Sequence, residues 1–336
     1  MIIATLVITL LQFTLYLLIA PAVIGTLRWF KARLQGRSGP SPLQPYFDIW
    51  KLARRRPVLP ETASWVFRAA PVVVFCCMAL IGMLTPIVYL PSSELITGVV
   101  GPPLADFLAI IYLLAFTHFV TGLAGMDSGS PFGGMGSGRE MFLHVLSEPV
   151  LVLSVFALAL NFHTTSLSLT MSRQFAAGLG GLLNNPSLWL VFFALVLTLL
   201  AESGRIPYDN PATHLELTMI GKAIHLEYSG IYLALLEWAD AMRLTFFIVL
   251  LLNLFFPFSM AAAGNPGWLN GLLVLGFIPK LAVVILILAV WEITRAKMRL
   301  RAVVVPSSIA LTFSILAVVI ALVVNYGGMM IGSAVR

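Results

Sequence analysis

Long apolar runs constrain this chain more than any other feature of its sequence. A helix needs about 20 apolar residues to cross the roughly 30 Å hydrocarbon layer of a bilayer, and lipid offers no partner to an open backbone. Because 60% of the residues are hydrophobic and only 10% are charged, a soluble globular domain is excluded. Eight runs of about the required length occupy residues 3–27, 68–90, 103–124, 141–162, 186–203, 229–256, 268–291 and 303–325.

These runs predict an all-α polytopic membrane protein, with one transmembrane domain over residues 1–336 and about eight transmembrane helices. The first run lacks a charged leader and exceeds the apolar core of a signal peptide, so we expect it to remain as a spanning helix. The predicted cytoplasmic loops cover about residues 28–67, 125–140, 204–228 and 292–302.

The positions of the basic residues predict the orientation of these helices. Sixteen of the 20 Lys and Arg residues fall in the odd-numbered connections. Cytoplasmic loops carry such an excess of positive charge, so both termini are predicted to lie outside. The net charge of +6 follows from this asymmetry, and no nucleic-acid partner is expected.

The first predicted loop contains an amphipathic segment. In "LQPYFDIWKL", apolar Phe47, Ile49 and Trp50 are interleaved with Asp48 and Lys51. This pattern predicts a short helix lying on the cytoplasmic membrane face. An alternative is that the segment only anchors the chain to anionic lipid.

The third predicted loop, "GMDSGSPFGGMGSGRE" at 125–140, is rich in glycine. It has neither the length nor the charge of a disordered linker. Because glycine lets backbones approach closely, we expect this loop to fit against a neighbouring segment.

Two sets of ionisable side chains enter the apolar runs in helical register. Ionised groups are costly inside a bilayer and tend to mark ion paths or binding sites. The two sets are Glu140, His144 and Glu148, at steps of four residues, and Glu237, Asp240 and Arg243, at steps of three. Both predict titratable tracks that enter from the cytoplasmic side.

Each track has a structural alternative. Glu140 would also serve as a helix-capping carboxylate, and His144 as a packing residue between neighbouring helices. Glu237 and Asp240 would form, with Arg243, an ion cluster that holds helices together. For the isolated His118 and His163, packing roles are expected.

The segment 201–230, "AESGRIPYDNPATHLELTMIGKAIHLEYSG", gathers the most charge in the chain. It is predicted to be the loop between the fifth and sixth helices, with Glu202 at the membrane edge and Arg205 close enough to pair with it. His214 and His225 are candidates for proton relay, or alternatively for binding a neighbouring protein. We expect Glu202 and Glu227 to respond to redox changes nearby.

No cofactor site is expected in this chain. Cys76 and Cys77 are adjacent and lack the spacing of zinc or iron–sulfur ligands. No metal ligands are predicted.

Several of these segments together carry a resemblance to a known family. In order they are "GRSGP", "LQPYFDIWKL", "LAGMDSGSPFGGMGSGRE", "AESGRIPYD", "LEL" and "EYSG". The chain resembles the subunit 1 family of respiratory complex I over nearly its whole length. The compact "GPSPLQP" is similar to the branch formed by the membrane subunits of energy-converting nickel–iron hydrogenases, the formate hydrogenlyase type included.

The resemblance implies an anchoring and energy-coupling subunit in a prokaryotic cytoplasmic (inner) membrane. Implied partners are the hydrogenase large subunit, an iron–sulfur small subunit and antiporter-like membrane subunits, with the nickel–iron centre and the iron–sulfur clusters held by partners. Matching motif positions imply coupling roles for Glu148, Glu202, Arg205, Asp209, Glu216 and Glu227. Residue type and spacing, not the resemblance, add Glu140, His144, His214, Glu237 and Asp240 as candidate coupling residues. Implied contacts with the peripheral arm are Asp48, Lys51, Asp127, Arg139 and Tyr228.

Two alternatives stay open beside the hydrogenase interpretation. The first is the quinone-chamber subunit of complex I, although Ala212 and His214 stand where that family often carries further acids. The second is a stand-alone secondary transporter, for which an inverted repeat with broken helices is expected; the sequence shows none.

Overall fold

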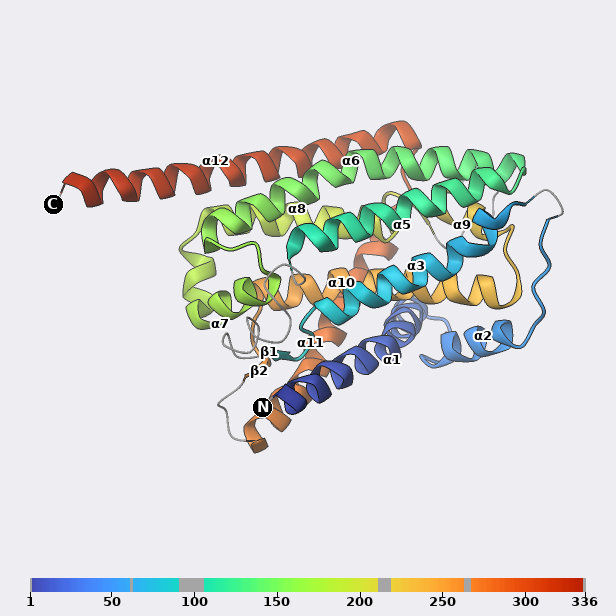
Figure 1. Cartoon of the computed structure of the whole chain (residues 1–336), viewed down its shortest axis with the longest axis horizontal. Helices are drawn as coiled ribbons and strands as arrows, with labels where there is room; N and C mark the ends of the chain where they lie inside the picture. Colours follow the sequence, from blue (N-terminus) through green and yellow to red (C-terminus); the bar gives the residue numbers. More distant parts are fainter. Residues whose placement is uncertain (1, 61–62, 91–105, 211–218, 263–266, 335–336) are drawn as a thin grey trace.

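The computed structural model describes residues 2–60, 63–90, 106–210, 219–262 and 267–334. Each of the eight predicted runs is occupied by a long helix (Figure 1). These helices are α1 (Ile2–Leu34), α3 (Trp65–Leu84), α5 (Phe107–Asp127), α6 (Pro131–Phe162), α8 (Pro186–Glu202), α10 (Gly230–Phe255), α11 (Gly267–Thr294) and α12 (Val304–Ala334).

Not all of these helices meet the requirements of a membrane span equally well. Within the described residues, six are long and apolar enough to cross a membrane: α1, α3, α5, α6, α11 and α12 with the turn before it. α8 is apolar but has only 17 residues, and α10 carries the charged residues Glu237, Asp240 and Arg243 near its middle. The all-α membrane fold is therefore confirmed, whereas the number of spans and the side of each terminus stay predictions.

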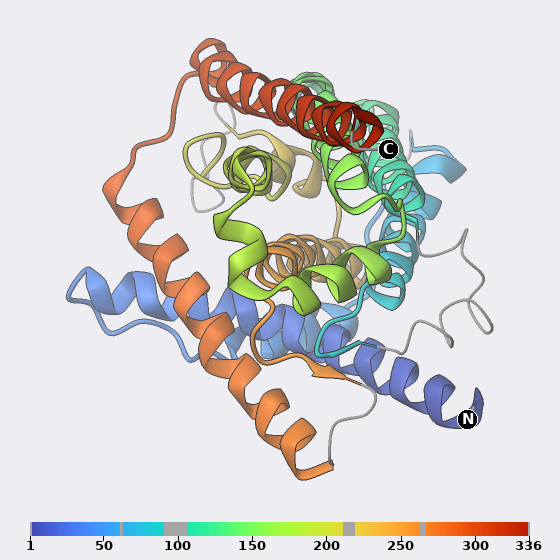
Figure 2. The same cartoon turned by 90° about the vertical axis from the view of Figure 1, so that its left-hand side faces the viewer.

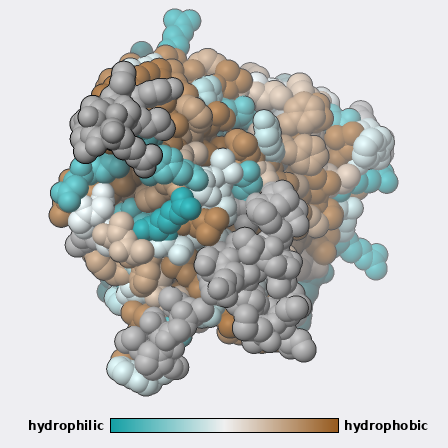
Figure 3. Space-filling model, turned by 60° about the vertical axis from the view of Figure 1, so that its left-hand side comes forward, coloured by the Kyte–Doolittle hydropathy of each residue, from teal (hydrophilic) through white to brown (hydrophobic). Residues whose placement is uncertain are grey.

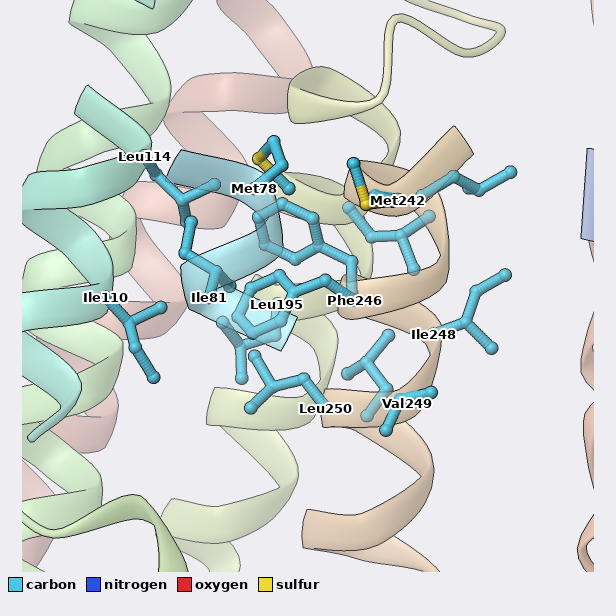
Figure 4. Packing of buried hydrophobic residues seen from close by; sticks show 14 of the residues in the cluster. Met78, Ile81, Ile110, Leu114, Leu195, Met242, Phe246, Ile248, Val249 and Leu250 are labelled. Carbon is cyan, nitrogen blue, oxygen red and sulfur yellow. The ribbon is translucent and has the colours of Figure 1, made fainter. Parts of the chain in front are cut away.

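Helix α10 lies at the centre of the bundle and is buried along most of its second half. It packs against α3 and α1, while α12 lies across α6 and α8. Figure 4 shows side chains from α3, α5, α8 and α10 meeting in this core, among them Met78, Ile110, Leu195 and Phe246. Because the second half of α10 is packed on all sides, its charged first half is held firmly at one end of the bundle.

Helix α11 leans away from the bundle and contacts mainly α1 (Figure 2). Its outer face carries Leu275, Ile278 and Ile287, which are 61–63% exposed. Apolar side chains also cover much of the molecular surface in Figure 3. Such faces match a lipid environment, where exposed apolar side chains carry no hydration penalty.

The shorter elements lie at the two ends of the bundle. At one end lie α2 (Gln44–Ala53), α9 (Gly221–His225) and the 3-10 turn η1 (Leu300–Val303). At the other lies α7 (Leu167–Leu183), which falls between two of the predicted apolar runs and is kinked at Gly178. There too, β1 (Tyr89–Leu90) pairs in parallel with β2 (Ala261–Ala262). The start of α1 and the end of α12 point away from α2 and α9 (Figure 1).

The predicted amphipathic helix is present as α2. Pro45 is buried, whereas Phe47 and Trp50 are 63% and 60% exposed. The guanidinium of Arg54 stacks over the Trp50 ring, 4.6 Å from its centroid. An exposed aromatic face flanked by basic residues fits the membrane surface, which stays a prediction for this helix.

The prediction that residues 125–140 form a loop is wrong. α5 continues to Asp127, and α6 begins at Pro131 after a short turn. Ser130 caps the new helix by accepting a hydrogen bond from the Phe132 amide, and proline suits the first helical position. The glycines instead allow close packing inside the helix: a Cβ on Gly136 would lie 2.9 Å from the Ala223 side chain.

Candidate functional site

A cavity of about 700 Å³ opens at the end of the bundle that the charge pattern predicts to be cytoplasmic. It lies between the last turns of α1, the first half of α6, the end of α8, α9 and the first half of α10. Its wall is strongly charged. The ionisable residues among those that line it are Arg28, Lys31, Arg37, Glu140, His144, Glu202, Arg205, Asp209, Lys222, His225, Glu237, Asp240 and Arg243.

Glu202 ends α8 and lies at the inner wall of this cavity, with only 2% of its surface exposed. Its Oε2 atom lies 2.7 Å from His118 Nε2, and its Oε1 atom lies 3.4 Å from His144 Nδ1. Ser147 Oγ donates a third hydrogen bond, at 2.5 Å, to Oε1. A buried carboxylate is tolerated only when it is paired in this way.

Two histidine rings stack beside this carboxylate. The centroids of His118 and His144 are 3.2 Å apart with an interplanar angle of 25°. Glu140, one turn before His144 on α6, places Oε1 3.7 Å from His144 Nε2. His118 is not isolated, because its ring belongs to a buried polar cluster with Glu140, His144 and Glu202. Its packing role stays a prediction.

Glu148 does not join the cluster. Each step of four residues turns a helix by about 40° beyond a full turn, so Glu148 is rotated by about 80° from Glu140. Its side chain is half-buried and makes no hydrogen bond or ion pair within the described part of the chain. The predicted track of three residues on α6 is thus reduced to Glu140 and His144.

The second predicted track, Glu237, Asp240 and Arg243 on α10, is also only partly kept, because two of its residues form ion pairs and the third forms none with a described residue. Lys222 Nζ on α9 lies 2.5 Å from Glu237 Oε1 and 3.1 Å from Asp240 Oδ2 on α10. His225 Nδ1 lies 3.6 and 3.7 Å from the same two carboxylates. Burial lowers the pKa of Lys222, but the neighbouring Asp240 and Glu237 raise it more, so that it ends above its usual value. Arg243 is buried and lines the cavity without an ion pair to any described residue.

The predicted pairing of Glu202 with Arg205 is wrong. Arg205 Nη1 instead lies 3.4 Å from Glu292 Oε1 on α11, and Lys31 Nζ on α1 lies 2.6 Å from the other oxygen. Side chains three residues apart meet only on a continuing helix. Here the helix ends at Glu202, and Gly204 turns the chain with a φ of 57°.

The rest of the fifth loop is held by its own contacts. Asp209 accepts a hydrogen bond from Lys297 Nζ at 2.5 Å and another from the Ile220 amide at 3.3 Å. The side chain of Glu227 is half-buried and makes no ion pair with a described residue. The two remaining predicted residues, His214 and Glu216, lie outside the described residues.

Three of the five predicted interface residues hold the fold itself. Asp127 Oδ2 accepts hydrogen bonds from the amide and hydroxyl of Ser64 and from the Phe67 amide, at 2.8–3.2 Å, at the start of α3. Tyr228 donates its hydroxyl to the Phe67 carbonyl at 2.9 Å and stacks on the Phe67 ring. Burial, with Asp127 nearby, raises the pKa of Tyr228. Arg139 donates to the carbonyl of Met219 at 3.0 Å.

The other two predicted interface residues belong to α2. Asp48 accepts a hydrogen bond from Gln44 at 2.9 Å, and Lys51 is exposed. Their docking to a partner stays a prediction.

Sequence reasoning missed four ionisable residues of these networks: His118, Lys31, Glu292 and Lys297. Glu292 is fully buried although it lies close to the end of a long apolar helix. That position was a signal, because an acid near the end of a spanning helix needs a partner at the same membrane level. No such signal pointed to the pairing of His118 with Glu202, because 84 residues separate the two in the sequence.

The fold and the site together define a multi-pass membrane protein whose charged residues converge on one end of a helical bundle. Residues 6–324 match the family described as NADH dehydrogenase. Formate hydrogenlyase subunit 4 of Escherichia coli is 31% identical over 87% of this chain and 90% of its own length. Hydrogenase-4 component C of the same organism is 34% identical over 74% of this chain and 75% of its own length.

Relatives also include NADH-quinone oxidoreductase subunit 8 of Rhodothermus marinus, 29% identical over 71% of this chain and 70% of its own length. Among solved structures, a chain of an archaeal respiratory membrane complex, the membrane-bound sulfane sulfur reductase, shares the fold. Its TM-score is 0.72 at 20% identity, over 92% of this chain and 98% of that one. The chain belongs to the NADH dehydrogenase family, that of complex I subunit 1.

Proposed function

We propose that this chain is the membrane-anchoring and energy-coupling subunit of a membrane-bound nickel–iron hydrogenase complex of the formate hydrogenlyase type. The identities to formate hydrogenlyase subunit 4 and hydrogenase-4 component C support this assignment. The complex would lie in a prokaryotic cytoplasmic membrane, with a hydrogenase large subunit, an iron–sulfur small subunit and antiporter-like subunits as partners. Those partners would hold the nickel–iron centre and the iron–sulfur clusters.

The single observation that carries the coupling role is the position of Glu202. This carboxylate is 2% exposed, yet it borders a cavity that reaches the predicted cytoplasmic end. Its partners His118 and His144 come from two other helices, α5 and α6. A buried charge next to such a cavity would couple electron transfer in a docked partner to the movement of H⁺ or Na⁺ in the membrane.

The peripheral subunits would dock over the end of the bundle that carries α2 and α9 (Figure 1). The exposed Lys51 on α2 is a candidate contact there. Asp127, Arg139 and Tyr228 would act indirectly, because their side chains hold α3 and the segment before α9 in place.

A second candidate function is the quinone-chamber subunit of complex I. The cavity volume of about 700 Å³ lies within the range of small-molecule sites, about 300–1,000 Å³, and the NADH-quinone oxidoreductase relatives support this alternative. The two functions differ in their partners. The test is to purify the complex with its natural partners and measure its nickel content. Nickel together with dye-linked hydrogen oxidation would support the hydrogenase function. Flavin together with quinone reduction and no nickel would support the complex I function.

The coupling role is tested by Glu202→Gln, which removes the buried negative charge and keeps the shape of the side chain. We expect unchanged nickel content and dye-linked hydrogen oxidation in the purified complex, but a loss of ion translocation in proteoliposomes. Asp106→Asn is the matched control, because Asp106 caps α5 at the opposite end of the bundle. Ion translocation by Glu202→Gln at the level of this control would refute the coupling role.

A further inference from the structure

Helices α1 and α11 end side by side at the predicted cytoplasmic end of the bundle, and both ends carry a tryptophan stacked with an arginine. The guanidinium carbon of Arg33 lies 5.4 Å from the centroid of the Trp29 ring, and that of Arg295 lies 5.2 Å from the centroid of the Trp291 ring. Both distances are within the roughly 6 Å of a cation–π contact. The Trp291 indole also donates a hydrogen bond to the Ile206 carbonyl at 3.0 Å, which fixes its position.

The two stacked pairs lie at the same height along the two helices. Lys31 Nζ on α1 lies 2.6 Å from Glu292 Oε2 on α11 and sets the register between the helices. The two tryptophans precede these ion-paired residues by two positions and by one, and the two arginines follow them by two positions and by three. At about 1.5 Å of rise per residue, these offsets differ by only about 1.5 Å. The two indoles therefore share one level, and the two guanidiniums share another level one turn nearer the helix ends.

An exposed apolar stripe of α11 leads up to this level. Val283, Ile287 and Val290 recur at steps of four and three residues and are 55%, 61% and 44% exposed. The helix leans away from the bundle and contacts mainly α1 (Figure 2), so the stripe is open to lipid. Tryptophan beside the end of an apolar stripe is typical of the membrane–water interface. Arg295, one turn beyond Trp291, then lies at the level of the lipid phosphates.

The exposed charge at this edge is positive. Four arginines of the two helix ends and of the connection after α11 are exposed, and none makes a hydrogen bond or ion pair with a described residue: Arg33, Arg295, Arg299 and Arg301. Glu292 lies at the same edge but is already paired with Lys31 and Arg205. A guanidinium stacked on a ring still presents its N–H groups, whose planar geometry suits the oxygens of a phosphate.

We propose that the edge formed by the ends of α1 and α11 binds an anionic phospholipid of the cytoplasmic leaflet. Arg33 and Arg295 donate hydrogen bonds to its phosphate oxygens, and its acyl chains lie along the stripe of Val283, Ile287 and Val290. A phospholipid has an apolar part and an anionic part in the same order as this surface, and a zwitterionic lipid would bring no net charge to the four arginines. The inference does not depend on the proposed function, because no partner protein takes part in it.

The test is native mass spectrometry of the purified full-length chain in a neutral detergent, titrated with dioleoylphosphatidylglycerol or with dioleoylphosphatidylcholine. We expect phosphatidylglycerol to bind at least tenfold more tightly than phosphatidylcholine. Arg33→Gln and Arg295→Gln should each weaken the binding of phosphatidylglycerol about fivefold, the contribution of one basic residue at an anionic membrane surface. Glycerol phosphate, which has no acyl chains, should not compete at equal concentration, and competition would overturn the assignment to a lipid.

Arg55→Gln is the matched control. Arg55 is exposed after α2, at the same end of the bundle, and its replacement removes the same charge, but its side chain stacks on no described ring. We expect this variant to bind phosphatidylglycerol like the wild type. All three variants should keep the wild-type unfolding temperature, because the side chains are exposed. Equal losses of binding in Arg55→Gln and Arg295→Gln would overturn the proposal, since they would show attraction to the net charge alone, as would equal affinity for the two lipids.

Discussion

The substitution Glu292→Gln tests whether the buried charge networks stabilise the fold. Glu292 is the shared partner of Lys31 on α1 and Arg205 in the loop after α8. Its side chain is 0% exposed, whereas those of Lys31 and Arg205 are 22% and 10% exposed. Glutamine keeps the shape and one acceptor but leaves two cations close together without a counter-charge.

The expected loss of stability follows from these exposures. Removing one partner of a buried ion pair costs about 3–5 kcal/mol. The lower end applies here, because Lys31 is partly solvated and the contact to Arg205 is long, at 3.4 Å. We therefore expect a loss of about 3 kcal/mol, which is roughly a hundredfold change in the unfolding equilibrium.

The assay is reversible unfolding of the purified chain by sodium dodecyl sulfate in mixed micelles. Glu148→Gln is the matched control, since it is the same change on a half-buried helical residue without an ion pair in the described structure. A double-mutant cycle with Lys31→Met should give a coupling energy of about 1–3 kcal/mol. Equal stability of Glu292→Gln and Glu148→Gln would refute the reasoning.

Two further substitutions test local structure in thermal unfolding. Asp127→Ala removes the acceptor of three hydrogen bonds at the start of α3 and should cost about 2 kcal/mol, whereas Asp106→Ala loses a single 3.4 Å bond and should cost less than about 1 kcal/mol. Gly136→Ala places a Cβ 2.9 Å from Ala223 and should cost about 1–3 kcal/mol. Gly138→Ala meets open space on the same helix and should stabilise by up to about 1 kcal/mol. Equal effects within either pair would contradict the packing described here.

The positions of the long helices could be predicted because the apolar runs determine them. The helix starts were less predictable. The glycines of segment 125–140 predict a loop. The helix nevertheless begins at Pro131, after the capping Ser130, well before the apolar part of that helix. Glycine lowers helix propensity by only about 1 kcal/mol per residue, which close packing against α9 offsets in this structure.

The candidate site could be predicted only where its residues lie on one helix. Glu140 and His144 are one turn apart, so their proximity follows from helical periodicity. Glu202 reaches the same point from α8, and His118 from α5, through helix packing that no local pattern encodes. The predicted pairing of Arg205 with Glu202 is wrong because the i, i+3 rule holds only within a continuous helix, and the helix ends at Glu202.

The charges of segment 201–230 thus act mainly by joining elements of the bundle. Glu202 joins the end of α8 to α5 and α6, Lys222 joins α9 to α10, and Arg205 joins the following loop to α11. Each contact closes part of the wall of one cavity. Since salt bridges in low dielectric weaken sharply when one partner moves or loses its charge, a charge change at any of these contacts would alter the shape and the field of the cavity together. That link between the charge of the wall and its geometry is what the proposed energy-coupling role requires.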